Sequence, residues 1–206
     1  MANLAAVAPS GMAVGVFNHT QYKITRPFFT FFGREFNVFG PDGTQIMYVK
    51  HPMMKLRDEW NVFTDKTQST KLLRVKAREA IALNITHDVF DAQTEQRVGT
   101  IRTRGLKSIL RDTWDILDPH DQPMGLLQED SSAILRRIFK IIPGKWHAEL
   151  GPQGSAFEVA RITQQFRFFT KEFTLDVSMA QGRMDTRLGL TCALLALMKE
   201  IERQDG

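Results

Sequence analysis

The chain has 206 residues, of which 43% are hydrophobic and fifteen are Phe. It can therefore bury a sizeable core, which excludes a globally disordered chain. A net charge of +4 favours anionic partners without selecting one, and the single cysteine excludes an internal disulfide framework and suits a reducing compartment.

The first twenty residues are rich in Ala and lack the Lys/Arg cluster that opens a secretory signal peptide. We expect residues 1–20 to form a flexible tail on a cytoplasmic protein. Residues 21–206 are expected to form a single domain.

A short motif then recurs along the chain. The pattern L-R-D-x-W at residues 56–60 returns at residues 110–114, and looser copies lie at 32–36 and 169–173. A repeat of 24 to 32 residues is typical of a supersecondary unit that is used several times. The six anchor residues of these units are Phe36, Trp60, His87, Trp114, Trp146 and Phe173.

Each unit has the pattern of a β-hairpin. The anchor begins a β-rich run such as residues 60–63, turn residues such as the G-P-D-G of residues 40–43 follow, and a second run returns. Six units of two strands predict about twelve strands, with the sixth unit leading into the last segment. The returning strands are expected at residues 46–50, 72–78, 98–102, 124–127 and 156–162.

The last segment, residues 185–203, predicts a helix that is apolar on every side. Asp185 is a suitable N-cap, and Lys199 and Arg203 suit the negative end of the helix dipole. The apolar part, residues 188–198, is about 16 Å long, which is too short for a bilayer core of about 30 Å. Such a helix must be buried all round by protein, and Cys192 within it is expected to be a core residue.

The helix and the hairpins together predict a closed barrel. Twelve antiparallel strands avoid exposed edges by closing, and a twelve-stranded barrel leaves room for a helix about 10 Å wide. The sequence therefore predicts a mainly β fold, a twelve-stranded antiparallel closed β-barrel that encloses a central C-terminal helix. A repeat sandwich with a surface helix would require a polar helical face, which this sequence lacks.

Units of the form L-R-D-x-W-x-[VI], P-D-G-type turns and a terminal apolar helix resemble the LURP-one-related proteins, which belong with the phospholipid scramblases in the Tubby C-terminal-like superfamily. The resemblance covers roughly Gln21–Arg203 and implies the same barrel, without enzymatic chemistry. Tubby domains bind phosphatidylinositol bisphosphate, and scramblases are linked to phospholipid movement. Two scramblase features are missing: a cysteine-rich palmitoylation cluster, and alternating oxygen ligands for calcium in residues 176–185.

Basic residues on the predicted strands are the main functional candidates. In residues 73–78 the alternation sends Leu73, Val75 and Ala77 toward the helix and three cations outward. Such a row is suited to bind phosphates, although outward cations also serve simply to solvate a strand and discourage edge pairing. The candidate lipid- or anion-binding residues are Lys50, Arg74, Lys76, Arg78, Arg102 and Arg104.

Two further clusters allow more than one interpretation. The basic stretch at residues 136–140 (R-R-I-F-K) suits a membrane interface or a solvated loop. The aromatic run at residues 27–32 suits a membrane wedge, a partner site or packing at the barrel rim.

Catalytic and metal sites are not expected. Asp115, Asp118 and Asp121 lie near one turn, but Asp115 belongs to a strand and Pro119 constrains the turn. The five histidines show no zinc spacing, and no nucleophile elbow, phosphate-binding glycine loop or Cys-x-x-Cys occurs. We therefore expect no enzymatic activity, cofactor or metal.

These observations predict a protein that binds acidic phospholipid headgroups, such as phosphoinositides, as a peripheral rather than transmembrane protein at the inner membrane surface. The alternative is a protein-interaction scaffold that uses the same outer surface without binding lipid. Specific nucleic-acid binding ranks last, because no aromatic platform alternates with the cations.

Overall fold

The computed structural model describes residues 15–27, 34–51, 59–81, 84–105, 112–131, 143–152, 155–165, 170–180 and 182–205. They form a closed antiparallel barrel in which each strand pairs with its sequence neighbours and β1 pairs with β12. A single long helix, α3 (Thr186–Asp205), follows the barrel. The strands are β1 (Gln21–Pro27), β2 (Arg34–Phe39), β3 (Gln45–His51), β4 (Trp60–Phe63), β5 (Lys71–Ile81), β6 (Asn84–Asp91), β7 (Arg97–Thr103), β8 (Thr113–Leu117), β9 (Pro123–Glu129), β10 (Lys145–Leu150), β11 (Phe157–Gln165) and β12 (Thr170–Asp176).

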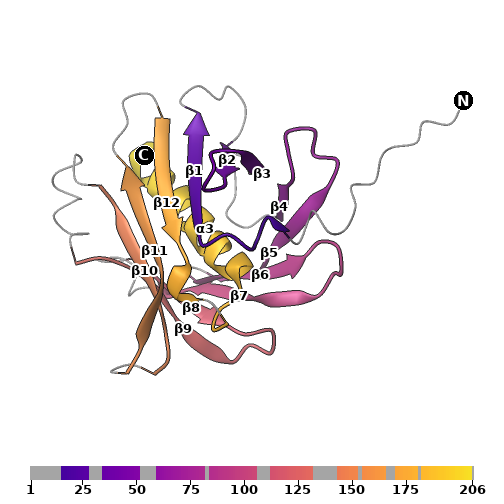
Figure 1. Cartoon of the computed structure of the whole chain (residues 1–206). Helices are drawn as coiled ribbons and strands as arrows, with labels where there is room; N and C mark the ends of the chain where they lie inside the picture. Colours follow the sequence, from indigo (N-terminus) through magenta and orange to yellow (C-terminus); the bar gives the residue numbers. More distant parts are fainter. Residues whose placement is uncertain are drawn as a thin grey trace, which may run out of the picture.

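The helix runs through the middle of the barrel, as the sequence predicts (Figure 1). The backbone N–H of Arg187 donates to Asp185 Oδ1 at 2.9 Å, so Asp185 is the N-cap. Every residue from Gly189 to Met198 is buried. None of the described helices is long and apolar enough to cross a membrane.

Each of the first five units is a hairpin, and all five predicted returning strands are present. The sixth unit differs from the prediction, because Phe173 belongs to a single strand, β12, that leads through a short 3-10 helix (Ser178–Ala180) into α3. The twelfth strand is β1, which precedes the first anchor and pairs with β12 over seven residues. Because β1 lies outside any complete unit, the repeat pattern does not predict it.

The five hairpins share a bulge that no sequence pattern indicates. Near the turn, two residues of the second strand face one residue of the first, for example Leu72 between the pairs Val62–Leu73 and Phe63–Lys71. A bulge bends a strand and increases its twist, which helps a sheet to close. The extra residue is apolar in each hairpin: Ile46, Leu72, Val98, Met124 and Val159.

The wall approaches the helix closely at Gly99 on β7. A Cβ built at Gly99 would lie 2.7 Å from the carbonyl oxygen of Leu117 and 2.9 Å from Leu188 Cδ1. The absence of a side chain there lets the first turn of α3 lie against β7.

The residues before β1 also touch the barrel. Of the predicted tail, residues 1–20, the stretch 1–14 lies outside the described residues. Val16 and Phe17 are partly buried against the core, and the Tyr22 hydroxyl donates to the carbonyl oxygen of Val16 at 3.1 Å. The end of the predicted tail is therefore attached to the barrel.

Candidate functional site

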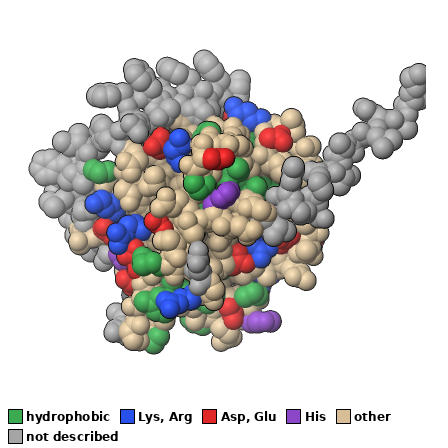
Figure 2. All heavy atoms as spheres, viewed as in Figure 1, with side chains coloured by type: hydrophobic (Ala, Val, Ile, Leu, Met, Phe, Trp, Pro, Cys, Tyr) green, Lys and Arg blue, Asp and Glu red, His purple; other side chains and the backbone are tan. Residues whose placement is uncertain are grey.

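The candidate basic residues lie on the outer wall of the barrel, as the alternation predicts. On β5, Leu73 and Val75 are fully buried, whereas Lys76 and Arg78 are exposed. Figure 2 shows Lys and Arg side chains next to Asp and Glu side chains over the visible face, rather than in a separate basic patch. The partners of each cation therefore decide what it can bind.

The Arg74 side chain contacts two carboxylates and an aromatic ring. Its guanidinium forms ion pairs with Glu95 and, at 3.6 Å, with Glu59. It also stacks over the ring of Phe90 at 4.4 Å. Its side chain is only 20% exposed, so a phosphate would have to displace existing partners to reach it.

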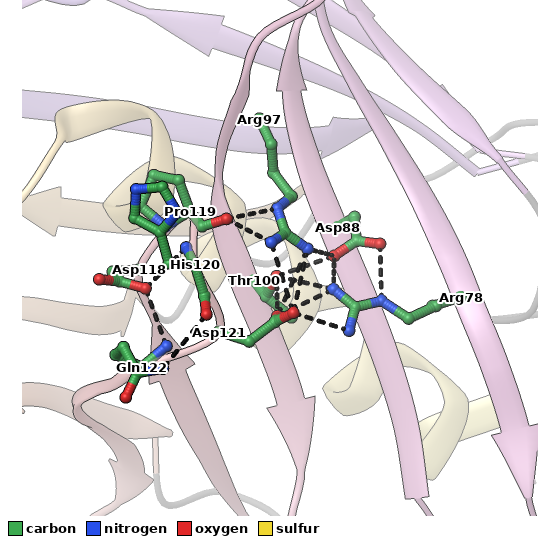
Figure 3. Close-up of polar contacts among 9 residues, drawn as sticks. All are labelled: Arg78, Asp88, Arg97, Thr100, Asp118, Pro119, His120, Asp121 and Gln122. Atoms are coloured by element: carbon green, nitrogen blue, oxygen red, sulfur yellow. Dashed lines mark hydrogen bonds and ion pairs between the residues drawn. The ribbon is translucent and has the colours of Figure 1, made fainter.

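Arg78 belongs to a network of two arginines and two carboxylates, together with Thr100 (Figure 3). Its Nε donates to Asp88 Oδ2 at 2.9 Å, and its Nη2 donates to Asp121 Oδ1 at 2.9 Å. Arg97 pairs with the same two carboxylates at 3.4 Å and 3.3 Å. The charges within this network are balanced.

A local irregularity positions Arg78 for this network. The pairing of β5 with β6 shifts between Ala77 and Glu79, which leaves Arg78 as the extra residue of a bulge. Bulges commonly change the direction of a side chain. Asp88 and Thr100 face each other in the pairing of β6 with β7, and the Thr100 hydroxyl donates to Asp88 Oδ1 at 2.8 Å.

The network attaches the β8–β9 turn to the wall. Asp121 lies in this turn, and Arg97 donates from its Nε to the carbonyl oxygen of Pro119 at 2.8 Å (Figure 3). Within the turn, Asp118 Oδ1 accepts the backbone N–H groups of His120 and Gln122. Arg78 therefore has a structural role that the sequence could not show.

The pKa values of both carboxylates in the network are lowered, although Asp88 is the more buried of the two. Burial acts to raise the pKa of Asp88, but hydrogen bonds from Arg78 and Thr100 and the charges of Arg78 and Arg97 outweigh burial and lower it. The pKa of Asp121 is lowered chiefly by its hydrogen bond from Arg78. The same carboxylates raise the pKa of Arg78.

This network predicts an acid-dependent loss of stability. Because the folded-state pKa values of Asp88 and Asp121 are lowered, their contribution is fully present above the unfolded-state value of about 3.9 and is lost as the pH falls below it. We expect Asp88→Asn to be less stable than the parent at neutral pH, with a difference that shrinks in acid. Urea unfolding across this pH range measures the difference, and a pH-independent difference would contradict the assignment.

Arg102 and Arg104 differ from the other candidate arginines because they converge on the same carboxylate. Arg102 Nη2 lies 3.1 Å from Asp115 Oδ2, and Arg104 Nε lies 2.6 Å from Asp115 Oδ1. Their side chains are 47% and 37% exposed, whereas Asp115 is 13% exposed. Asp115 thus holds the exposed guanidinium of Arg102 and the partly exposed guanidinium of Arg104 side by side on the wall.

Lys50 and Lys76 are exposed, and neither has a carboxylate within ion-pair distance among the described residues. Lys50 faces Asn61 across β3 and β4, and Lys76 faces Asp88 across β5 and β6. The six candidates therefore form a band along the wall rather than one pocket.

Three residues of this wall have roles that the sequence patterns did not indicate. Asp88 and Arg97 complete the network around Arg78, and Asp121 ties the turn to it. Alternation along β6 could have placed Asp88 outside the barrel, but no pattern along one strand shows which cations lie next to its carboxylate.

The three acidic residues of the fourth hairpin have different partners and do not converge on a common point. Asp115 pairs with arginines of the β7 region, Asp118 accepts turn N–H groups and Asp121 pairs with Arg78. Among the described residues, no group of three potential ligand side chains is arranged to hold a metal. The basic stretch 136–140 and the aromatic residues 28–32 lie outside the described residues.

Comparison with known proteins adds one structural similarity. No family model matches the chain, and no curated protein matches it. The chain is similar to the X-ray structure of a protein from Arabidopsis thaliana, with 12% identity and a TM-score of 0.49. The similarity covers 91% of this chain and 95% of that one.

Proposed function

We propose that the protein is a non-enzymatic, peripheral membrane-surface protein that binds acidic phospholipid headgroups, including phosphoinositides, in the cytoplasm. The observation that supports this proposal is the pair of guanidinium groups of Arg102, which is exposed, and Arg104, which is partly exposed, that lie side by side against Asp115. The repeated hairpin motif around an enclosed helix supports the further proposal of kinship with LURP-one-related and scramblase proteins.

The proposed headgroup site is centred on Arg102 and Arg104. Planar guanidinium groups suit phosphate oxygens, and a cation near an anionic leaflet contributes roughly 1 kcal/mol. The exposed Lys50 and Lys76 lie farther along the wall and add long-range attraction. Arg74 and Arg78 are better explained as residues that stabilise the barrel wall through ion pairs with neighbouring carboxylates.

The proposal predicts opposite effects for two variants. Arg102→Gln with Arg104→Gln is expected to weaken binding to phosphatidylserine-containing vesicles about 30-fold, for two cations at roughly 1 kcal/mol each. Asp115→Asn removes the shared carboxylate and is expected to strengthen binding. Vesicle sedimentation at increasing salt measures both effects, and binding should weaken as salt rises.

A matched control is Arg161→Gln, which removes one exposed guanidinium that pairs with Glu158 on β11. It should leave vesicle binding close to that of the parent. Absence of binding to anionic vesicles, or binding that does not depend on salt, would refute the proposed function.

A protein-interaction module is the second candidate. The balanced charges around Arg78 and Arg97, and the two carboxylates beside Arg74, favour it, because ion pairs of both signs suit a complementary protein surface better than a phosphate cluster. Recovery of one stoichiometric protein partner, with no affinity for vesicles, would favour this candidate over lipid binding.

A further inference from the structure

Two large hydrophobic side chains are exposed among the residues that the structure describes: Phe157, which is 40% exposed, and Met179, which is 51% exposed. Phe157 is the first residue of β11, and Met179 lies in the short 3-10 helix (Ser178–Ala180) that leads into α3. β11 packs against this 3-10 helix. Single exposed hydrophobic residues are common on proteins, whereas neighbouring ones indicate a possible binding surface.

The exposed side chain of Arg183 connects these two residues. Its guanidinium carbon lies 4.6 Å from the centre of the Phe157 ring. The backbone N–H of Arg183 donates to the carbonyl oxygen of Ala180 at 2.8 Å, so Arg183 belongs to the same turn as Met179. Within the described part of the chain, no carboxylate lies within ion-pair distance of Arg183.

The turn that carries Met179 is fixed to the barrel. Asp176 Oδ1 accepts the backbone N–H of Ser178 at 2.9 Å, and the N–H of Ala180 donates to the carbonyl oxygen of Val177 at 2.9 Å. Val177 and Ala180 are buried in the core, which leaves Met179 on the solvent side of the 3-10 helix. A surface that is already ordered loses little conformational entropy when a partner binds.

We infer that Phe157, Met179 and Arg183 form a docking surface for a protein segment that presents an acidic side chain beside a large apolar one. A guanidinium that stacks on an aromatic ring can still donate two N–H groups to one carboxylate. Phe157 and Met179 supply the apolar contacts, and Met adapts readily to the shape of a partner. Aromatic residues, Met and Arg are also the residues enriched at the centres of protein interfaces.

An anionic bilayer suits this surface less well than a protein segment does. The neighbouring charges are paired with one another: Glu158 with Arg161 at 2.8 Å, and Asp185 with Arg187 at 2.6 Å. Arg183 is therefore a single cation without an excess of positive charge around it. A bilayer spreads its negative charge over a wide area and is recognised by clusters of cations, whereas one acidic side chain requires one cation.

This docking surface lies at the opposite end of the barrel from the proposed headgroup site. β7 (Arg97–Thr103) and β11 run in the same direction, because antiparallel neighbours alternate around the barrel. Phe157 begins β11, whereas Arg102 and Arg104 flank the last residue of β7. The inference does not depend on lipid binding, and a protein segment and a bilayer can be bound at the same time.

The test selects binders from a phage-displayed library of random short peptides on the whole immobilised chain. We expect the enriched peptides to carry Asp or Glu beside Leu, Phe or Trp. Fluorescence anisotropy of a labelled enriched peptide should show binding about tenfold weaker or more for Arg183→Gln and for Met179→Ser, both of which change exposed residues. No enrichment, enriched peptides without this pattern, or equal binding to the parent and both variants would overturn the inference.

A charge exchange separates the expected ion pair from hydrophobic contact alone. When the acidic residue of the peptide is replaced by Lys, Arg183→Glu should bind the new peptide more tightly than the parent chain does. The two changes should therefore be strongly non-additive. If their effects on binding simply add, the acidic side chain does not contact Arg183 and the inference is wrong.

The matched control is Lys23→Gln, because Lys23 Nζ also lies over an aromatic ring, at 5.0 Å from the centre of Phe39. It should bind the peptide as tightly as the parent does, and an equal loss at both sites would contradict the assignment. The variant Phe157→Ser with Met179→Ser should sediment with phosphatidylserine-containing vesicles as the parent does. If it loses vesicle binding, this surface contacts a bilayer and the inference is overturned, whereas absence of vesicle binding in the parent refutes only the proposed function.

Discussion

Leu194→Asp is expected to abolish soluble folding. Leu194 is completely buried in the middle of α3, and every neighbouring residue of the helix from Gly189 to Met198 is also buried. An unpaired carboxylate at this position lacks both water and a partner, and the cost is at least about 4 kcal/mol, a large part of the stability of a typical domain. Expression in the soluble fraction and circular dichroism measure the outcome.

Leu194→Met is the matched control, because it keeps the volume and the apolar character of the side chain. Its cost should stay below about 1.5 kcal/mol. A Leu194→Asp protein as stable as the parent would show that α3 is not enclosed, and the barrel could not then have a helix at its centre.

Gly125→Ala is expected to destabilise the barrel by about 3 kcal/mol or more. Gly125 lies on β9 and pairs with Ile116 on β8 and Leu150 on β10. A Cβ at this position would lie 1.9 Å from the carbonyl oxygen of Glu149 and 2.8 Å from Leu150 Cα. Both neighbours are backbone atoms, so a rotamer change cannot relieve the overlap and β10 would have to move.

The control is Gly15→Ala, because a Cβ at Gly15 meets nothing within 4 Å. Denaturant unfolding of the two variants separates the close approach at β9 from a general effect of removing a glycine. Equal stabilities of Gly125→Ala and the parent would contradict the strand spacing at this position.

The barrel was predictable because its signals are local and repeated. A hydrophobic run without a polar side, such as residues 188–198, requires burial from every direction, and the hairpin units supply the strands. The repeat does not predict β1, since its seven residues contain no anchor and their place in the barrel depends on pairing with β12. The sequence also does not predict the five hairpin bulges, because an extra residue in a ladder depends on the register of the opposite strand.

The candidate site was predictable only in part, for a related reason. Alternation along β5 correctly places Arg74, Lys76 and Arg78 outside the barrel. The partners of these residues come from elsewhere in the chain: Asp121 is 43 residues from Arg78, and Glu95 is 21 residues from Arg74. A pattern along one strand predicts the direction of a side chain. The charged groups next to that side chain depend on the neighbouring strands and turns.

The junction of β1 with β12 has a consequence for how the protein reaches its native state during synthesis. The side chains of Gln21 and Asp176, which are 155 residues apart, are hydrogen-bonded across this junction. β1 is therefore synthesised long before its partner β12, and α3 emerges later still. Nascent hairpins can form in order, but the cylinder closes only once β12 has been made, which favours slow folding and a dependence on chaperones for the unpaired strands in the meantime.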